Sequence, residues 1–135
     1  MPLFNWTDNL SVGVREFDSH HQRLIELINI LNDSIINGND DIITKQVLVE
    51  LTNYTLYHFF TEEDVMLRSG YPGYFHHRKE HLDLTGKTFA FLEKLQDEGT
   101  KLSQDVLNFL KDWLTHHILE TDKRYSGFLN GKGIS

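Results

Sequence analysis

Hydrophobic residues recur at helical spacing in four stretches of the chain. Apolar side chains lie three and four residues apart within residues 19–36, 41–68, 74–95 and 102–118, which is the pattern of one buried helix face. Short breaks that contain glycine separate the four stretches. Helices joined by short connections pack as antiparallel neighbours. The pattern therefore predicts an all-α fold, an up-down-up-down antiparallel four-helix bundle with an N-terminal arm.

The residues outside the predicted bundle form an arm and a tail. Residues 1–17 are the arm, residues 18–122 the bundle and residues 123–135 the tail, all within a single domain. Ser19 and Gln22 have the spacing of a capping box at the start of the first helix. The tail contains three glycines, so we expect it to be partly irregular. Four apolar side chains of the arm are available to hold it against the bundle: Trp6, Val12, Val14 and Phe17.

Composition and charge limit the classes of function. The chain has 135 residues, no cysteine and a formal charge of −7, which exclude thiolate ligands and argue against a nucleic-acid partner. It has no apolar run long enough to span a membrane and no secretory signal at its start, so we expect a cytoplasmic protein without a membrane partner. We see no apolar stripe on the outer faces of the predicted helices and therefore expect a monomer.

Polar residues interrupt the apolar stripes over a short part of each helix. His58 and Glu62 are four residues apart and so lie one above the other on the same helix face, as do His77 and His81. Burying histidine and glutamate without partners is costly. A metal ion removes that cost because it binds imidazole nitrogen and carboxylate oxygen directly. The spacing therefore predicts a metal site inside the bundle.

The predicted topology brings these polar positions together. In an up-down-up-down bundle, the starts of the first and third helices lie at the same end as the finishes of the second and fourth. Histidines and one glutamate occur in these four parts of the helices: His21, His58, Glu62, His77, His81 and His117. We therefore expect them to converge at one end of the bundle.

Three adjacent histidine pairs hold six of the eight histidines: His20-His21, His76-His77 and His116-His117. His76 shares a helix face with Glu80 and other charged residues, which indicates solvent, whereas His77 shares a face with Leu84, which indicates the core. Spacing alone does not decide between the members of the first pair or of the third pair. His20 is spaced with leucines, and His116 is four residues before Glu120.

The order of the polar motifs resembles that of bacterial hemerythrins over nearly the whole chain. Four motifs carry the resemblance: Asp18-x-x-His21, His58-x-x-x-Glu62, His77-x-x-x-His81 and His117-x-x-x-x-Asp122. The flanking residues also match: Phe59 after His58, Glu63 after Glu62, Tyr71-Pro72, and Trp113-Leu114. The resemblance favours His21 and His117 as ligands, and it leaves His20, His76 and His116 as ordinary surface or core residues. Asp122 would need a loosened helical turn, because five residues separate it from His117.

The resemblance implies a non-haem centre of two iron ions (Fe2+/Fe3+) that binds dioxygen. One iron would be held by His77, His81 and His117 and the other by His21 and His58. Glu62, Asp122 and one oxo or hydroxo oxygen from solvent would bridge both irons. The second iron then has one ligand fewer and keeps a position open for dioxygen. The resemblance also implies an apolar pocket around that position: Leu24, Phe59, Trp113, Leu114 and Ile118.

Three functions are compatible with such a centre. The resemblance favours reversible dioxygen binding for carriage, storage or delivery, with an oxygen-using enzyme or a reductase as a partner. A di-iron enzyme, such as a peroxidase or a protein handling nitric oxide or iron, is less favoured, because the E-x-x-H motif of oxygen-activating ferritin-like bundles is absent. We therefore expect that the chain is not an enzyme. An oxygen or redox sensor would need a separate signalling protein, with residues 1–17 as the segment that reports ligand binding.

Overall fold

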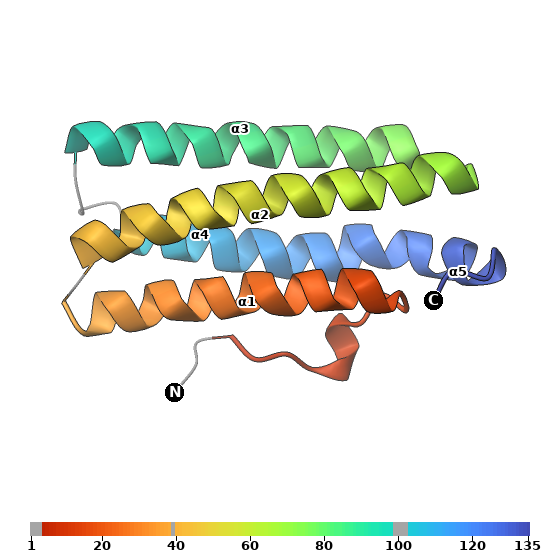
Figure 1. Cartoon of the computed structure of the whole chain (residues 1–135), viewed down its shortest axis with the longest axis horizontal. Helices are drawn as coiled ribbons and strands as arrows, with labels where there is room; N and C mark the ends of the chain where they lie inside the picture. Colours follow the sequence, from red (N-terminus) through yellow and green to blue (C-terminus); the bar gives the residue numbers. More distant parts are fainter. Residues whose placement is uncertain (1–3, 39, 99–102) are drawn as a thin grey trace.

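The computed structural model describes residues 4–38, 40–98 and 103–135, and these residues form helices and short connections (Figure 1). A 3-10 helix, η1 (Asp8–Leu10), precedes the long helices α1 (Arg15–Ile36), α2 (Asp40–Ser69) and α3 (Tyr74–Glu98). The fourth helical rod consists of α4 (Ser103–His116), the π-helix η3 (His117–Asp122) and α5 (Lys123–Gly131). None of the helices in the described ranges is long and apolar enough to cross a membrane.

The long helices lie side by side and alternate in direction (Figure 1). Helix α1 packs against α2 and α4, and α2 packs against α3. The starts of α1 and α3 and the ends of α2 and α4 lie at the same end, on the right of Figure 1. The predicted all-α, up-down-up-down four-helix bundle is therefore confirmed.

Two glycines reverse the chain between helices. Gly38 after α1 and Gly70 after α2 have φ values of 75° and 74°, a region that favours glycine because it has no Cβ. At the end of α2 the backbone N–H of Tyr71 donates to the carbonyl of Met66 at 2.9 Å, which satisfies a free helix-end carbonyl. Short reversals of this kind keep α1, α2 and α3 close enough to share one core.

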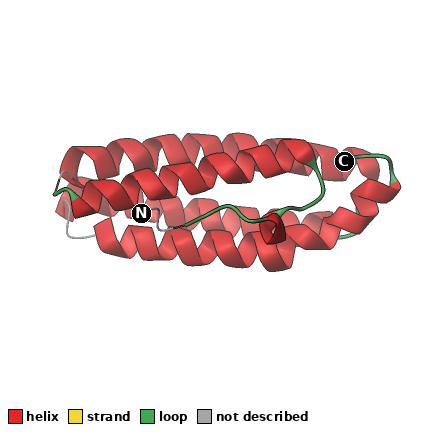
Figure 2. Ribbon diagram, turned by 90° about the horizontal axis from the view of Figure 1, so that it is seen from below, coloured by secondary structure: helices red, strands yellow, loops and turns green. Residues whose placement is uncertain are grey.

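The arm is held against the bundle, as its apolar residues predict. Val12 and Phe17 are fully buried, and the side chain of Asn29 on α1 exchanges two hydrogen bonds with the backbone of Phe4, at 2.9 and 2.7 Å. Figure 2 shows the arm running along the face of the bundle. The arm therefore covers the side of α1 and adds to the core.

Two boundaries differ from the sequence predictions. Helix α1 begins at Arg15, so the predicted capping box at Ser19 is wrong. Instead, the Asp18 carboxylate accepts hydrogen bonds from the Ser11 hydroxyl and the Val12 N–H, at 2.6 and 2.8 Å, and joins the arm to the first turn. The tail is helical up to Gly131, and only the last four residues are irregular. The predicted start of the fourth helix at Leu102 lies outside the described residues.

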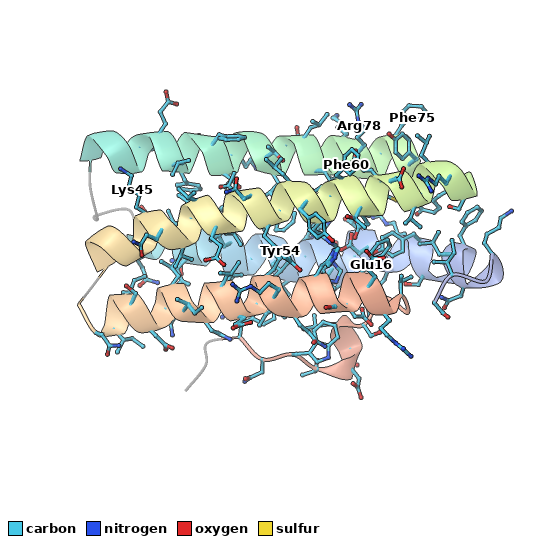
Figure 3. All side chains as sticks on the ribbon, in the orientation of Figure 1. Glu16, Lys45, Tyr54, Phe60, Phe75 and Arg78 are labelled. Carbon is cyan, nitrogen blue, oxygen red and sulfur yellow. The ribbon has the colours of Figure 1, made fainter. Side chains whose placement is uncertain are left out.

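The outer faces of α2 and α3 carry exposed apolar side chains, so the predicted absence of an apolar outer stripe is wrong. Phe60 is 75% exposed and Phe75 is 79% exposed. Phe75 and Arg78 point away from the bundle (Figure 3). Other large apolar residues on these two helices are also exposed: Val49, Leu56, Leu67, Leu82 and Phe89. This face removes the reason for expecting a monomer.

Candidate metal centre

A cluster of buried polar side chains replaces the apolar core at one end of the bundle. Each of its seven residues is at most 2% exposed, and they come from α1, α2, α3 and η3: His21, His58, Glu62, His77, His81, His117 and Asp122. These are the seven positions singled out from the sequence, and the structure brings all of them together. Their convergence follows from the alternating helix directions, which place the starts of α1 and α3 beside the ends of α2 and of the fourth rod.

The cluster divides into two overlapping groups of potential metal ligands. One contains Glu62, His77, His81, His117 and Asp122, and the other contains His21, His58, Glu62 and Asp122. Within each group the potential ligand atoms all lie within 4.8 Å of one another. We call them the three-histidine half and the two-histidine half, and both halves share the two carboxylates.

Each carboxylate turns one oxygen toward each half. Glu62 Oε1 lies 2.8 Å from His77 Nε2, whereas Glu62 Oε2 lies 3.1 Å from His58 Nε2. In the same way Asp122 Oδ1 lies 2.9 Å from His77 Nε2, whereas Asp122 Oδ2 lies 3.0 Å from His21 Nε2. A carboxylate that offers its two oxygens in two directions has the geometry needed to bridge two cations.

Several atoms of the cluster are buried without a hydrogen-bond partner. Among the described residues, these include the Nε2 atoms of His21 and His58 and both carboxylate oxygens of Asp122. Leaving such groups unpaired in a dry interior costs about 1–3 kcal/mol each. Cations between them would use these lone pairs and offset the two negative charges. The mixed imidazole and carboxylate donors suit iron, so the residues present fit a dinuclear iron site.

A π-helix brings Asp122 into the cluster. Residues His117–Asp122 form η3, whose wider turn aligns residues five apart on one face. Asp122 Oδ1 consequently lies 2.9 Å from His117 Nε2. The loosened turn that the spacing of His117 and Asp122 requires is thus confirmed.

The electrostatics of the cluster without metal differ between the two halves. Burial alone lowers the pKa of His77, but the adjacent carboxylates of Asp122 and Glu62 outweigh it and raise the pKa to about 10. Burial alone also lowers the pKa of His117, but the negative charge of Asp122 outweighs it and the pKa rises to about 9. In the two-histidine half, burial dominates and lowers the pKa of His58 to about 4. Without metal, His77 and His117 of the three-histidine half therefore hold protons that His58 of the two-histidine half lacks.

The two carboxylic acids are held ionised by the histidines around them. Burial alone raises the pKa of Glu62, but its close contact with His58 and its hydrogen bonds with His77 and His81 hold it well below its ordinary value. Burial and Glu62 together raise the pKa of Asp122, yet His117 and His21 also hold it well below the usual range. Both carboxylates are therefore available as anionic ligands at neutral pH.

The other member of each histidine pair lies either at the surface or in the core. His76 and His116 are 67% and 59% exposed at their side chains and pair with Glu80 and Glu120 at the surface. His20, in contrast, is buried, and its Nδ1 atom lies 2.7 Å from Nδ1 of His58. His20 is thus a core residue in contact with the cluster, and spacing within one helix gives no sign of this contact between helices.

Sequence reasoning also missed Tyr125. This side chain is fully buried, and its hydroxyl donates to Glu62 Oε2 at 2.9 Å. Its ring stacks on His77 at 5.5 Å between centroids. The available signal was its position three residues after Asp122, which places it one turn further along the same rod. The predicted irregular tail hid that signal.

A small apolar cavity lies between the four helices next to the cluster. It leaves about 10 Å³ for the centre of a water-sized molecule, close to the smallest space that holds one. Its lining includes Leu24, Trp113 and Leu114, three of the five predicted pocket residues. The other two predicted pocket residues are not part of this lining. Phe59 stacks on His81 at 3.7 Å between centroids, and Ile118 is fully buried.

The fold and the site together define a class: a four-helix bundle with a buried dinuclear histidine and carboxylate centre. A family model described as the Hemerythrin HHE cation binding domain matches residues 12–129. The chain belongs to the hemerythrin family. The centre of this family holds two iron ions, and the buried cluster described above is suited to them.

Individual relatives match the chain over nearly its whole length. The bacteriohemerythrin of Methylococcus capsulatus is 33% identical over 131 residues, 96% of this chain and 99% of that protein. The bacteriohemerythrin of Clostridium acetobutylicum is 31% identical over 129 residues, 91% and 98% of the two chains. The crystal structure of wild-type hemerythrin has a TM-score of 0.86 at 31% identity and covers 94% of this chain and 98% of that one. The chain is thus a di-iron, oxygen-binding domain.

Proposed function

We propose that this chain binds dioxygen reversibly and serves in its carriage, storage or delivery. We assign seven ligands to the two irons: His77, His81 and His117 to one, His21 and His58 to the other, and Glu62 and Asp122 to both. The single observation that carries the proposal is that the two halves share both carboxylates but have three and two histidines. The three-histidine half would supply one protein ligand more than the two-histidine half, which would leave the second iron a position for a small molecule.

When bound, two ferrous ions supply the two electrons that dioxygen takes up, and they recover them when dioxygen leaves. The contribution of the chain is to hold the ions and to keep water and protons away. Leu24, Leu114 and Ile118 are buried apolar residues close in sequence to ligands on α1 and the fourth rod. Dry apolar walls of this kind suppress side reactions such as proton leakage.

The Tyr125 hydroxyl contacts one of the two shared carboxylates, that of Glu62. Burial first, and then the negative charge of Glu62, raise the pKa of Tyr125 well above its ordinary value. Its proton is engaged in the hydrogen bond to Glu62 Oε2. The residue therefore holds the carboxylate in place.

Reversibility is the property to test. The iron-loaded chain is reduced without oxygen, exposed to air and then degassed, while its visible absorption is recorded. We expect a new absorption band in air that disappears on degassing over repeated cycles. A Glu62→Ala variant, which lacks one shared carboxylate, is the matched control and should give no such band. Immediate oxidation of the unaltered chain, without return on degassing, contradicts the proposal.

Sensing is a second candidate because the arm contacts the site. The Phe17 ring packs edge-on against His58 at 6.2 Å between centroids, and the neighbouring Asp18 binds the arm through Ser11 and Val12. A shift of His58 would reach the arm through Phe17. Hydrogen exchange in residues 4–17 tests this: a difference between oxygen-loaded and oxygen-free protein favours sensing, and identical exchange argues against it.

A further inference from the structure

The rings of the candidate ligands differ in what lies behind them. An imidazole that binds a metal through one nitrogen has a second nitrogen facing away, and the partner of that nitrogen orients the ring and tunes its basicity. In the three-histidine half, the outward Nδ1 of His81 lies 3.1 Å from a carboxylate oxygen of Glu63. His117 Nδ1 lies 3.9 Å from Glu80, which also accepts a hydrogen bond from Thr121. In this half, a carboxylate therefore lies near the outward Nδ1 of two histidines, His81 and His117.

The two-histidine half has an imidazole in the corresponding place. Nδ1 of His58 lies 2.7 Å from Nδ1 of His20, and both side chains are buried. The His20 ring is held among aromatic neighbours, with Tyr54 at 5.7 Å and Tyr57 at 5.1 Å between centroids. Its position is thus set by packing against α2 and not only by the hydrogen bond.

The direction of this hydrogen bond follows by elimination. His58 Nε2 faces Glu62 Oε2 at 3.1 Å, on the side of the assigned metal position, so it must keep its lone pair free. The proton of the neutral His58 ring is then on Nδ1. Two nitrogens 2.7 Å apart need one donor and one acceptor. His58 therefore donates, and His20 accepts with Nδ1 and carries its own proton on Nε2.

We propose that His20 is a positioning residue for the two-histidine half, which accepts the Nδ1–H of His58 and so fixes the tautomer and orientation of that ligand. This inference rests on the ligand assignment of the proposed function. A neutral imidazole attracts the His58 proton less strongly than a carboxylate attracts that of His81. The two halves are thus unequal in donor strength as well as in the number of histidines.

A matched pair of variants separates the two halves. His20→Leu removes the partner of His58, and Glu63→Leu removes the partner of His81. Zinc titration of the full-length, metal-free chain measures two binding steps without involving dioxygen. Loss of such a partner costs about 10–100-fold in metal affinity. We expect His20→Leu to weaken one step by this factor, Glu63→Leu to weaken the other step, and His116→Gln at the surface to weaken neither.

Two measurements distinguish a positioning role of His20 from simple packing: recovery of zinc binding in a second variant, and the tautomer of His58. His20→Gln keeps an acceptor and should restore the binding step that His20→Leu weakens. In the zinc-loaded protein, nitrogen NMR should find the His58 proton on Nδ1, with the shift of that proton changed in His20→Gln. A His58 proton on Nε2, or His20→Gln behaving like His20→Leu, overturns the proposal. If His20→Leu does not fold, the glutamine variant and the NMR assignment still decide.

Failure of the ligand assignment would look different. If the unaltered chain binds no zinc, or if Glu62→Ala binds as much zinc as the unaltered chain, the assigned site itself is wrong. If the unaltered chain binds two zinc ions and His20→Leu leaves both steps unchanged, only the role of His20 is wrong.

Discussion

The three-histidine and two-histidine halves share Glu62 and Asp122, yet they differ in almost everything else. Without metal, the first half holds protons on His77 and His117, whereas burial keeps His58 of the second half neutral. Carboxylates stand behind two rings of the first half, and His20 stands behind His58 of the second. One buried site can therefore offer two like cations surroundings that differ in protonation and in the groups behind the histidine rings.

The largest change should come from removing what the halves share. Glu62→Ala removes one carboxylate oxygen from each half and leaves Asp122 as the remaining shared carboxylate. We expect the variant to lose both irons, measured by elemental analysis of the purified protein. Glu120→Gln, at an exposed position of the fourth rod, should keep both irons. Full iron content in Glu62→Ala would show that the halves do not share this residue.

A smaller change should follow from removing a ligand of one half only. His58→Ala takes away one of the two histidines of the second half, and the three-histidine half keeps all its own ligands. Iron content should fall from about two per chain to about one. The exposed His116 offers the control, since His116→Ala should not alter the iron content. Complete loss of iron in His58→Ala would mean that the halves fill only together.

The two halves should also differ in the pH dependence of their metal binding. His77 and His117, with pKa values of about 10 and 9, must release protons when metal binds, whereas His58 has none to release near neutral pH. Affinity of the three-histidine half should rise by about tenfold per pH unit for each proton displaced, up to pH 9–10. His58 should add little to the pH dependence of the other half above neutral pH. Calorimetric titration with zinc in buffers of different ionisation enthalpy counts the protons.

The same shifts predict how the stability of the metal-free protein depends on pH. The raised pKa values of His77 and His117 contribute stability in full below about pH 6.5, and this contribution is lost as pH rises through 9 to 10. The lowered pKa of His58 acts in the opposite sense and costs stability as pH falls from about 6.5 towards 4. Urea unfolding across pH 4–10 should therefore find a maximum between these limits. A flat profile above pH 7 would contradict the assignment of the two raised pKa values.

The smallest expected effect concerns Tyr125. Tyr125→Phe leaves the ring in place but removes the hydrogen bond to Glu62 Oε2, the oxygen that faces the two-histidine half. Loss of one buried hydrogen bond to a charged group should cost about 1–3 kcal/mol of unfolding free energy. Both irons should still bind, with faster iron loss from one half only. Chelator-induced iron release, followed over time, distinguishes one affected half from two.

Most of the bundle and of the ligand set could be predicted from spacing, because a helix places residues three and four apart on one face. Spacing could not decide between His20 and His21, since both members of the pair turn out to be buried. The contact between His20 and His58 joins two helices, and a pattern within one helix carries no information about it. Asp122 reaches the site only through the π-helix, whose register differs from that of a regular helix.

Local signals misled the prediction where tertiary contacts override them. Ser19 and Gln22 have the spacing of a helix start, but the binding of Asp18 to the arm lets α1 begin at Arg15. Glycines in the tail suggested irregular structure, but burial of Tyr125 and Leu129 keeps α5 helical. Helix periodicity also hid the exposed phenylalanines of α2 and α3, because apolar residues occur on both faces of these helices.

Mössbauer spectroscopy of the iron-57-loaded chain tests the inequality of the two halves most directly. Only one half has an open position in this account, so dioxygen should make the surroundings of the two irons differ further. We predict about two irons per chain and, with dioxygen bound, two doublets of equal area, which revert on degassing. A single doublet in the oxygen-loaded protein, doublets of unequal area, or about one iron per chain would contradict the account.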